Sequence, residues 1–281
     1  MKRLIGFLAV LTLVLTGCQE NIDFELNSEK SRIVVEATLT DSVMKHPVKL
    51  TMTTSYYETQ SATMVDGATV TITDGTTTWP VIQEGDGLYY TPEMGIEPSK
   101  TYTLRIEKDG EVYEGTDSAP IKVKVDSVVL RLVENPDFET GEDIPEYSVV
   151  LFAQENPGLG DHYLWKYYVK KPDTAWRDMT PRFNDWSYAA DDFVDGRSPA
   201  EGWEIFGFID TAEIPTGSLV KMEMYSISKE YYEFLSAMSQ QTNRGGLFDG
   251  PPANIPTNMS NNAIGFFNVA PMDYGIDVNE Y

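Results

Sequence analysis

Short alternating segments of apolar and polar residues, separated by turn residues, fill the chain between residues 31 and 119. A period of two residues is what a β-strand with one buried face requires. The strands predicted on this basis span residues 32–40, 48–54, 68–73, 101–106 and 111–115. Asp109-Gly110, between the last two, is a strong hairpin pattern. Strands this short and this frequent predict an immunoglobulin-like β-sandwich over residues 31–119.

A second domain is predicted over residues 120–281, and it too is rich in β-strands. The strand-like segments there span residues 122–133, 147–153, 163–169, 203–209, 219–225 and 263–268. A C-terminal segment, 245–258, is rich in Gly, Pro and Asn, and a loop of that length is typically functional or held in place by packing. The fold class predicted for the whole chain is therefore mainly β.

One α-helix is predicted, over residues 229–241, with Ser228 as a suitable N-cap. Its apolar side chains are three and four residues apart and so form one stripe, which consists of Tyr231, Phe234, Leu235 and Met238. A stripe of this kind is typical of a helix that packs on a core. The second domain is accordingly predicted to carry one packed helix.

The first 18 residues have the layout of a bacterial lipoprotein leader. A basic pair at residues 2–3 precedes an apolar run at 4–15, which is shorter than the about 20 residues that cross a bilayer. Leu15-Thr16-Gly17-Cys18 resembles the lipobox, in which the cysteine thiol is acylated by palmitate-type chains, cleavage falls just before the cysteine, and the new amine is acylated too. Residues 1–17 are thus predicted to be a signal peptide and Cys18 the lipidated residue, with a plain secretory leader as the alternative.

Residues 18–30 are acidic and without periodicity, and they predict a tether between the lipid and the folded body. An acidic run directly after the lipidated cysteine resembles the export signal of Bacteroidota lipoproteins that reach the outer face of the outer membrane. An ordinary solvated linker explains the run equally well. The expected location is the outer membrane, at the cell surface, with the periplasmic face as the alternative.

The charge balance narrows the range of partners. The chain has 44 acidic and 21 basic side chains and a formal net charge of −23. Nucleic acids and anionic lipid surfaces are bound through Lys and Arg, so this balance argues against both and leaves the lipid on Cys18 as the membrane anchor. Cys18 is also the single cysteine, which excludes a disulfide within one chain.

Aromatic side chains are the best indication of a binding surface, because four of the five tryptophans lie between residues 165 and 203. Exposed rings can stack on a sugar or a flat ligand, or anchor a partner protein. The candidate contact residues are Trp165, Tyr168, Trp176, Trp186 and Trp203. The alternative is that these rings fill a core that no disulfide supports.

Motifs for catalysis, metals and cofactors are weak or missing in the sequence. The chain has two histidines and no nucleophile elbow, so no catalytic residue and no cofactor is predicted. Asp191, Asp192 and Asp195 offer hard oxygens to a cation, but they lack the spacing of a calcium loop. They are weak metal candidates, and a solvated acidic turn is the alternative.

Several blocks of the sequence resemble one known family. These blocks are the lipobox, Val34-Val35-Glu36, residues 67–74, 192–196, 224–235, 251–258 and 263–267. Together they are similar to the Bacteroidota lipoprotein family catalogued as domain of unknown function 4249, over nearly the whole mature chain. The resemblance implies a lipoprotein that is often encoded beside a TonB-dependent outer-membrane transporter. It implies no activity and no catalytic residues.

The function predicted from these observations is a non-catalytic accessory module that binds a small ligand or glycan for a TonB-dependent uptake system. One alternative is a surface hydrolase that acts on glycans. Another is a structural, adhesin-like spacer. Two carboxyl groups about 5–9 Å apart in a cleft with aromatic walls would favour the hydrolase.

Overall fold

The computed structural model describes residues 31–54, 61–136, 141–180, 188–191, 199–242 and 254–281, and these residues are mainly β. They belong to one compact unit, Ser31–Tyr281. The predicted signal peptide, the tether with Cys18, and Trp186, Asp192 and Asp195 lie outside the described residues. No helix in the described ranges is long and apolar enough to cross a membrane.

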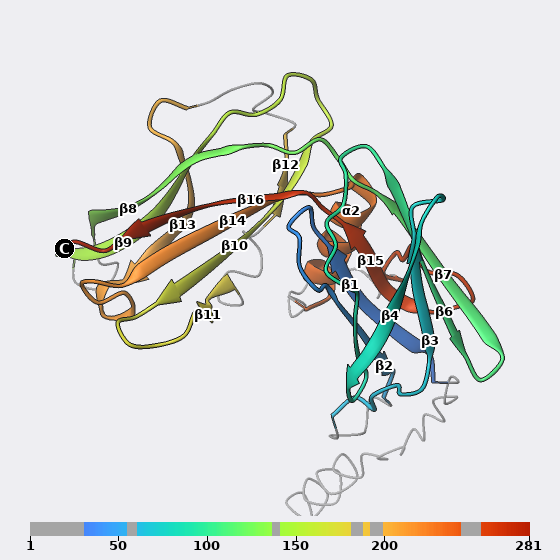
Figure 1. Ribbon diagram of the computed structural model, residues 1–281. Coiled ribbons are helices and arrows are strands. Elements are labelled where there is room, and N and C mark those ends of the chain that lie inside the picture. The colour runs from blue at the N-terminus through green and yellow to red at the C-terminus, as the bar shows by residue number, and fades with distance from the viewer. Residues whose placement is uncertain (1–30, 55–60, 137–140, 181–187, 192–198, 243–253) are drawn as a thin grey trace, which may run out of the picture. The chain divides into compact units, whose positions relative to one another are not determined.

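Eight strands form the first sheet (Figure 1). They are β1 (Ile33–Leu39), β2 (Pro47–Met52), β3 (Thr69–Thr73), β4 (Thr78–Gly85), β5 (Leu88–Tyr90), β6 (Thr101–Lys108), β7 (Glu111–Ser118) and β15 (Ile264–Val269). Their order is β15-β1-β2-β5-β4-β3-β6-β7, and β1 and β15 are the parallel pair. The five strands predicted between residues 31 and 119 are confirmed as β1, β2, β3, β6 and β7.

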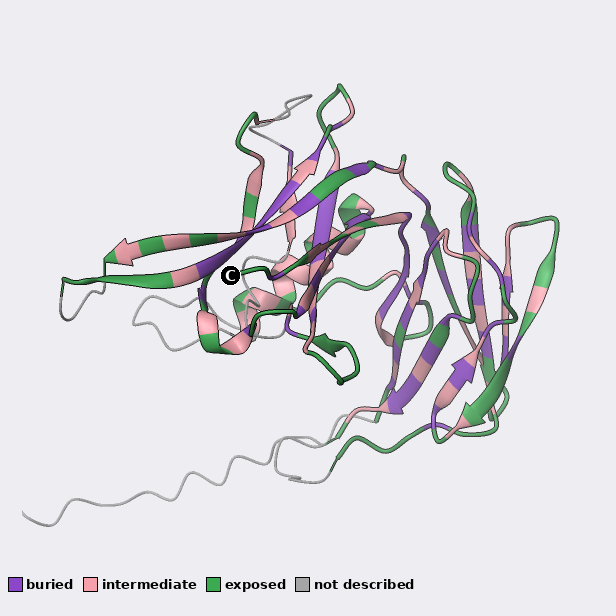
Figure 2. Ribbon diagram, turned by 60° about the vertical axis from the view of Figure 1, so that its left-hand side comes forward, coloured by how far each residue is buried: buried purple, intermediate pink, exposed green. Residues whose placement is uncertain are grey.

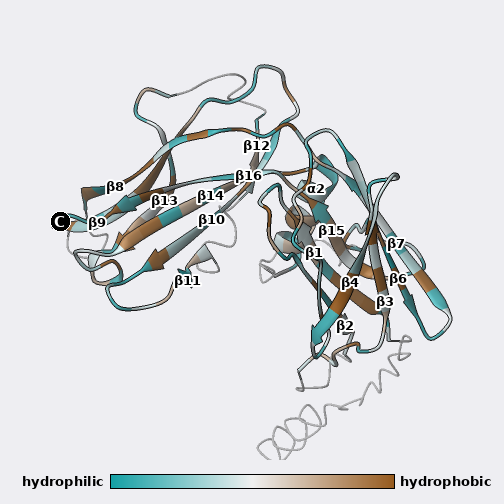
Figure 3. Ribbon diagram, viewed as in Figure 1, coloured by the Kyte–Doolittle hydropathy of each residue, from teal (hydrophilic) through white to brown (hydrophobic). Residues whose placement is uncertain are grey.

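Alternation of burial explains why these segments become strands. In β1 every second residue, from Ile33 to Leu39, is buried, and buried and less buried positions also alternate along β3 and most of β6 (Figure 2). Tyr89, Tyr102 and Phe267 are the largest side chains in the resulting core. Hydrophilic residues collect instead at turns such as the β6–β7 hairpin (Figure 3).

The predicted immunoglobulin-like sandwich is not confirmed; the structure has a nearly closed sheet. β4 pairs with β3 at one end and with β5 at the other, so a single strand continues through what would be two sheets. The two ends of the strand order, β7 and β15, also approach each other. The Ser260 amide donates to the Glu114 carbonyl over 2.7 Å, and the Val269 amide donates to the Asp117 carboxylate over 2.8 Å.

Two further sheets pack face to face in the rest of the chain. The five-stranded sheet contains β10 (His162–Lys170), β11 (Arg177–Asp178), β12 (Tyr188–Ala190), β14 (Leu219–Ser226) and β16 (Met272–Val278). The three-stranded sheet has the order β13 (Trp203–Asp210), β9 (Asp143–Ala153) and β8 (Val125–Pro136). A shared apolar core lies between them and includes Trp165, Tyr167, Met222, Leu151 and Phe206. A short 3₁₀ helix, η2 (Thr211–Glu213), follows β13.

β16 joins the edges of these two sheets through carboxylates. Asp273 accepts a hydrogen bond from the Val125 amide over 2.9 Å, and Asp277 accepts one from the Leu130 amide over 2.7 Å. Both amides belong to β8, so the aspartates satisfy backbone donors at a sheet edge that no described strand covers there. The side chains of Asp273 and Asp277 therefore point toward β8, and the apolar side chains of β16 point to the opposite face of the strand.

The C-terminal chain crosses between the sheets. β15 pairs with β1 over six residues, and the chain then continues directly into β16, which pairs with β14. At the crossing point the Asp41 carboxylate accepts from the Met272 amide over 2.8 Å and from the Lys122 ammonium over 2.9 Å. The prediction of consecutive domains, 31–119 and 120–281, did not include this return of the chain to the first sheet.

The predicted helix is confirmed as α2 (Lys229–Thr242), the α-helix of the described residues. Ser228 caps it by accepting a hydrogen bond from the Tyr231 amide over 3.2 Å. Tyr231 and Phe234 lie 5.1 and 5.3 Å from the ring of Phe266 on β15, as the apolar stripe predicted. Met238, the last residue of the stripe, is 38% exposed.

Candidate functional site

The five-stranded sheet has one face in the core and one face turned away from it. Successive side chains of a strand point to opposite faces. Tyr167 on β10 and Met222 on β14 are buried in the core. Their sequence neighbours Tyr168 and Lys221 therefore point to the outer face of the sheet. The strand register places Tyr168 beside Lys221 and Lys221 beside Ile276 of β16.

Helix α2 covers one end of this outer face. Tyr232 and Leu235 of the helix pack there with Leu164 and Tyr225. At the other end no described element covers the apolar side chains of β16, and Tyr274, Ile276 and Val278 are 53%, 46% and 44% exposed. The uncovered end is therefore the part of the sheet that a ligand can reach.

Three aromatic rings surround one ammonium group at the uncovered end. The Lys221 Nζ lies 4.4 Å from the ring centroid of Tyr168, 5.4 Å from that of Trp176 and 5.9 Å from that of Tyr274. These distances are in the range of cation–π attraction. Lys221, Tyr168, Trp176 and Tyr274 together are called the Lys221 cluster below.

A buried carboxylate holds the lysine of the cluster in place. Glu223 accepts from the Lys221 Nζ at one oxygen and from the Tyr225 hydroxyl at the other, both over 2.6 Å. Burial raises the pKa of Tyr225 above its ordinary value, and the Glu223 carboxylate raises it further. The same two causes raise the pKa of Tyr168. Both phenols therefore stay protonated at neutral pH.

The outer rings of the cluster keep accessible surface. Trp176 is 37% exposed and Tyr274 is 53% exposed, while the lysine between them has a side chain that is 21% exposed. Because Glu223 already neutralises the lysine, the accessible groups are mainly ring faces and the aliphatic stem of Lys221. The arrangement can stack on a flat apolar surface.

The structure separates the aromatic residues that the sequence grouped together. Trp165 is 6% exposed and belongs to the core, and the half-buried Trp203 packs against the same core. Tyr168 and Trp176 meet in the Lys221 cluster. Trp186 lies outside the described residues. Tyr274 and Lys221 were not among the predicted contacts.

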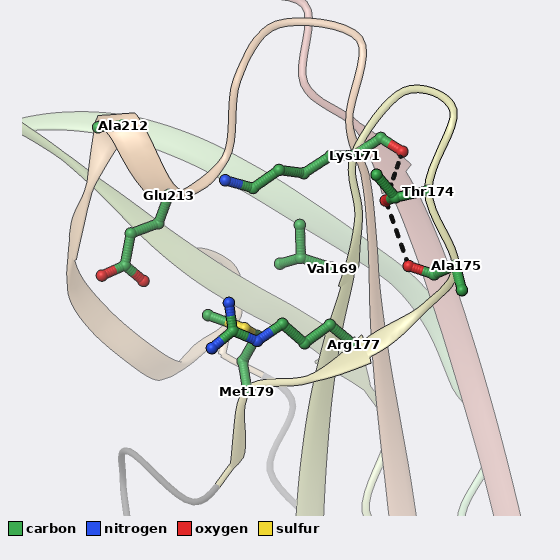
Figure 4. A pocket seen from close by; sticks show the side chains of 8 residues that line it. All are labelled: Val169, Lys171, Thr174, Ala175, Arg177, Met179, Ala212 and Glu213. Atoms are coloured by element: carbon green, nitrogen blue, oxygen red, sulfur yellow. Dashed lines mark hydrogen bonds between the residues drawn. The ribbon is translucent and has the colours of Figure 1, made fainter.

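A cavity of about 600 Å³ lies beside the β10–β11 hairpin, on the side opposite the Lys221 cluster (Figure 4). Its lining residues come from the end of β10, the hairpin turn, β11 and η2, and they are Val169, Lys171, Thr174, Ala175, Arg177, Met179, Ala212 and Glu213. The Thr174 hydroxyl donates to the carbonyls of Lys171 and Ala175 over 2.9 and 3.3 Å, which fixes the turn.

Asp191, the weak metal candidate that the structure describes, has a structural role. Asp191 is 1% exposed, and its two carboxylate oxygens accept from the Gly160 amide over 3.0 and 2.9 Å. Asp161 accepts from the Tyr163 hydroxyl over 3.3 Å, whereas the adjacent His162 packs against the ring of Tyr232. Within the described ranges no group of three His, Cys, Asp or Glu side chains is placed to hold a metal ion.

Comparison with protein families gives one match over most of the chain. A family model described as "Domain of unknown function (DUF4249)" matches residues 19–273. This range contains every strand of the three sheets except the last residues of β16. No curated protein matches the chain.

Proposed function

The chain belongs to the DUF4249 family, and from that premise we propose that it is a binding module that captures a glycan on the Lys221 cluster. The observation that carries the proposal is the pair of accessible rings, Trp176 and Tyr274, on either side of a lysine whose charge is already neutralised. Sugar rings have apolar C–H faces that stack on aromatic side chains, and their hydroxyls bond the polar groups at the edges.

The position of the cluster supports binding of an extended ligand. The cluster lies on three strands, β10, β14 and β16, and on the hairpin turn that carries Trp176, so strand pairing fixes the distances between its members. A rigid platform loses little conformational entropy when a ligand binds. Ile276 and Val278 extend the apolar surface of the platform along β16.

The proposal includes attachment to a membrane. We place the module on the outer membrane, anchored by acyl chains on Cys18 and displayed at the cell surface by the acidic residues 18–30. In that position it delivers its ligand to a TonB-dependent transporter. The lipobox-like sequence that ends at Cys18 and the family resemblance support this part of the proposal.

Trp176→Ala is expected to weaken glycan binding about tenfold or more. Truncating an aromatic ring at the centre of a contact typically costs about 2 kcal/mol of binding free energy. Tyr274→Ala should act in the same direction. Affinity electrophoresis of the full chain in gels that contain amylopectin, xylan, arabinogalactan or polygalacturonate measures the effect. At least one polysaccharide should retard the wild type and release both variants.

The matched control is Phe208→Ala, which removes a ring that is 70% exposed on β13, in another sheet. This variant should migrate like the wild type in every gel. If none of the polysaccharides retards the wild type, or if Phe208→Ala reduces retardation as much as Trp176→Ala does, glycan capture on the Lys221 cluster is wrong.

Cys18→Ser is expected to release the protein from the membrane, since the chain's only thiol would then be missing and no acyl chain could be attached. Fractionation of cells should move the protein from the membrane pellet to the soluble fraction. Ser31→Cys, which adds a thiol outside the lipobox, is the control and should leave the wild-type distribution unchanged. A Cys18→Ser protein that remains fully in the pellet contradicts lipid anchoring.

The two alternatives stay predictions. The cavity beside η2 has one carboxylate among its described lining residues, Glu213, and so offers no observation that favours the glycan hydrolase. The exposed rings of the Lys221 cluster favour a binding role over that of a spacer.

A further inference from the structure

The cavity beside the β10–β11 hairpin has features of a second binding site. Its volume of about 600 Å³ falls in the range of small-molecule pockets, and it is formed by residues from β10, β11 and η2 (Figure 4). Val169 and Met179 are 3% and 6% exposed and contribute apolar surface to its lining. A ligand seated there would be partly removed from water.

Two cations point into this space. Figure 4 shows the Lys171 ammonium and the Arg177 guanidinium directed toward the same region of the cavity. In the part of the chain that the structure describes, neither side chain donates a hydrogen bond or forms an ion pair. Arg105, by contrast, bonds the carboxylates of Glu107 and Glu114.

The two cations lack a carboxylate partner among the described residues although the chain is acidic. The sequence has 44 acidic side chains and 21 basic ones, so a cation that needed only a counter-charge would have carboxylates in excess to choose from. Two cations that line one cavity repel each other, and an anion bound between them removes that repulsion. Guanidinium and ammonium groups bind carboxylate and phosphate oxygens through short, charge-assisted hydrogen bonds.

We propose that the cavity is a binding site for a small hydroxylated anion, a molecule that carries one carboxylate or phosphate group on a polyhydroxylated body. Lys171 and Arg177 bind the anionic group. Glu213, on the far side of the cavity in Figure 4, accepts hydrogen bonds from hydroxyl groups at the other end of the ligand. The apolar side chains of Val169 and Met179 contact the carbon skeleton.

This site is separate from the Lys221 cluster, and the inference therefore goes beyond the proposed function. Ala175 and Arg177 line the cavity, whereas Trp176 lies against Lys221 on the outer face of the sheet. One hairpin thus presents adjacent residues to two different surfaces. Variants of one surface leave the side chains of the other in place.

The test is isothermal titration calorimetry of the full chain in detergent with three probes. D-glucuronate carries a carboxylate, D-glucose 6-phosphate carries a phosphate, and D-glucose has the same body without charge. The expected result is binding of one or both anions, with glucose at least tenfold weaker. Which anion binds more tightly distinguishes a carboxylate source from a phosphate source.

Lys171→Gln and Arg177→Gln are each expected to weaken binding of the anion about tenfold or more, the loss typical of a charged hydrogen-bond partner. Lys170→Gln is the matched control, since it removes the same charge one residue away on the opposite face of β10. It should bind the anion within about twofold of the wild type, as should Trp176→Ala. Thermal unfolding of each variant verifies that it is folded.

Three results would overturn the inference. The first is a folded wild type that binds neither anion. The second is equal binding of glucose and the anions. The third is unchanged anion binding in both Lys171→Gln and Arg177→Gln, which would place the anion elsewhere on the protein.

Discussion

Gly265→Ala is expected to lower the free energy of unfolding by about 3 kcal/mol or more. Gly265 lies in β15 opposite Val35 of the parallel strand β1 and has a φ of +88°. A Cβ atom at this position would overlap the carbonyl oxygen of Val35 and lie 2.9 Å from its carbonyl carbon and amide nitrogen. These are backbone atoms of a fully buried residue and cannot move aside without breaking the pairing of the two strands.

Gly75→Ala is the matched control for that substitution. Gly75 has a similar φ of +85°, but no other atom lies within 4 Å of the position that its Cβ would take. This variant should lower the free energy of unfolding only by the cost of the left-handed conformation, about 1 kcal/mol. Urea unfolding of both variants measures the difference. Equal losses for the two glycines would contradict the predicted clash with the backbone of Val35.

The second large effect is a dependence of stability on pH through Asp117. This carboxylate is 7% exposed and accepts hydrogen bonds from the amides of Ser118 and Val269. Burial raises its pKa to about 6 from 3.8, and the nearby Glu230 carboxylate acts in the same direction. The folded protein therefore binds a proton more readily than the unfolded chain does, and acid favours folding at this site.

The sign and the size of the effect follow from the difference between the two pKa values. The stabilisation by protonation is complete below about pH 4 and is lost as the pH rises through about 6, a change of about 3 kcal/mol in all. Between about pH 7.5 and about pH 4.5 the wild type should gain about 2 kcal/mol relative to Asp117→Asn, which cannot titrate. Urea unfolding of both proteins across this range isolates the contribution, because carboxylates that do not interact with Asp117 affect both equally. Parallel stability curves for the two proteins would contradict it.

The strands of the first sheet could be predicted because one of their faces is buried and the other is exposed to solvent. That is the condition under which a period of two appears in the sequence, as in β1 and β6. The near closure of the sheet could not be predicted. It depends on the pairing of β15 with β1, and more than 220 residues separate these two strands in the sequence. Pairing at that distance leaves no local pattern in the chain.

β16 shows why an alternating pattern can still be missed. Its apolar residues, among them Tyr274 and Ile276, face outward, and its aspartates bond the amides of β8. The usual rule assigns the apolar set to the core, so the alternation in β16 predicts the wrong face as the buried one. Tyr274 was absent from the predicted site because the candidate contact residues came from the tryptophan-rich segment, residues 165–203.

The candidate site was predictable only in part. Two of the aromatic residues singled out from the sequence, Tyr168 and Trp176, lie together beside Lys221. Composition cannot distinguish a ring in the core from one on the surface, and Trp165 was grouped with them. Lys221 gives no pattern of its own in the sequence, because a lysine on a strand is ordinarily a solvated residue. Its role depends on Glu223, two residues along the same strand, and on rings from three other segments.

The crossing of the C-terminal chain between two sheets has a consequence for the cooperativity of folding. β15 completes the first sheet and β16 completes the five-stranded sheet, and residues 270–271 are all that separates these two strands. Detachment of this one segment therefore removes an edge strand from both sheets at once. The two sheets are thus expected to open together in one cooperative step rather than independently.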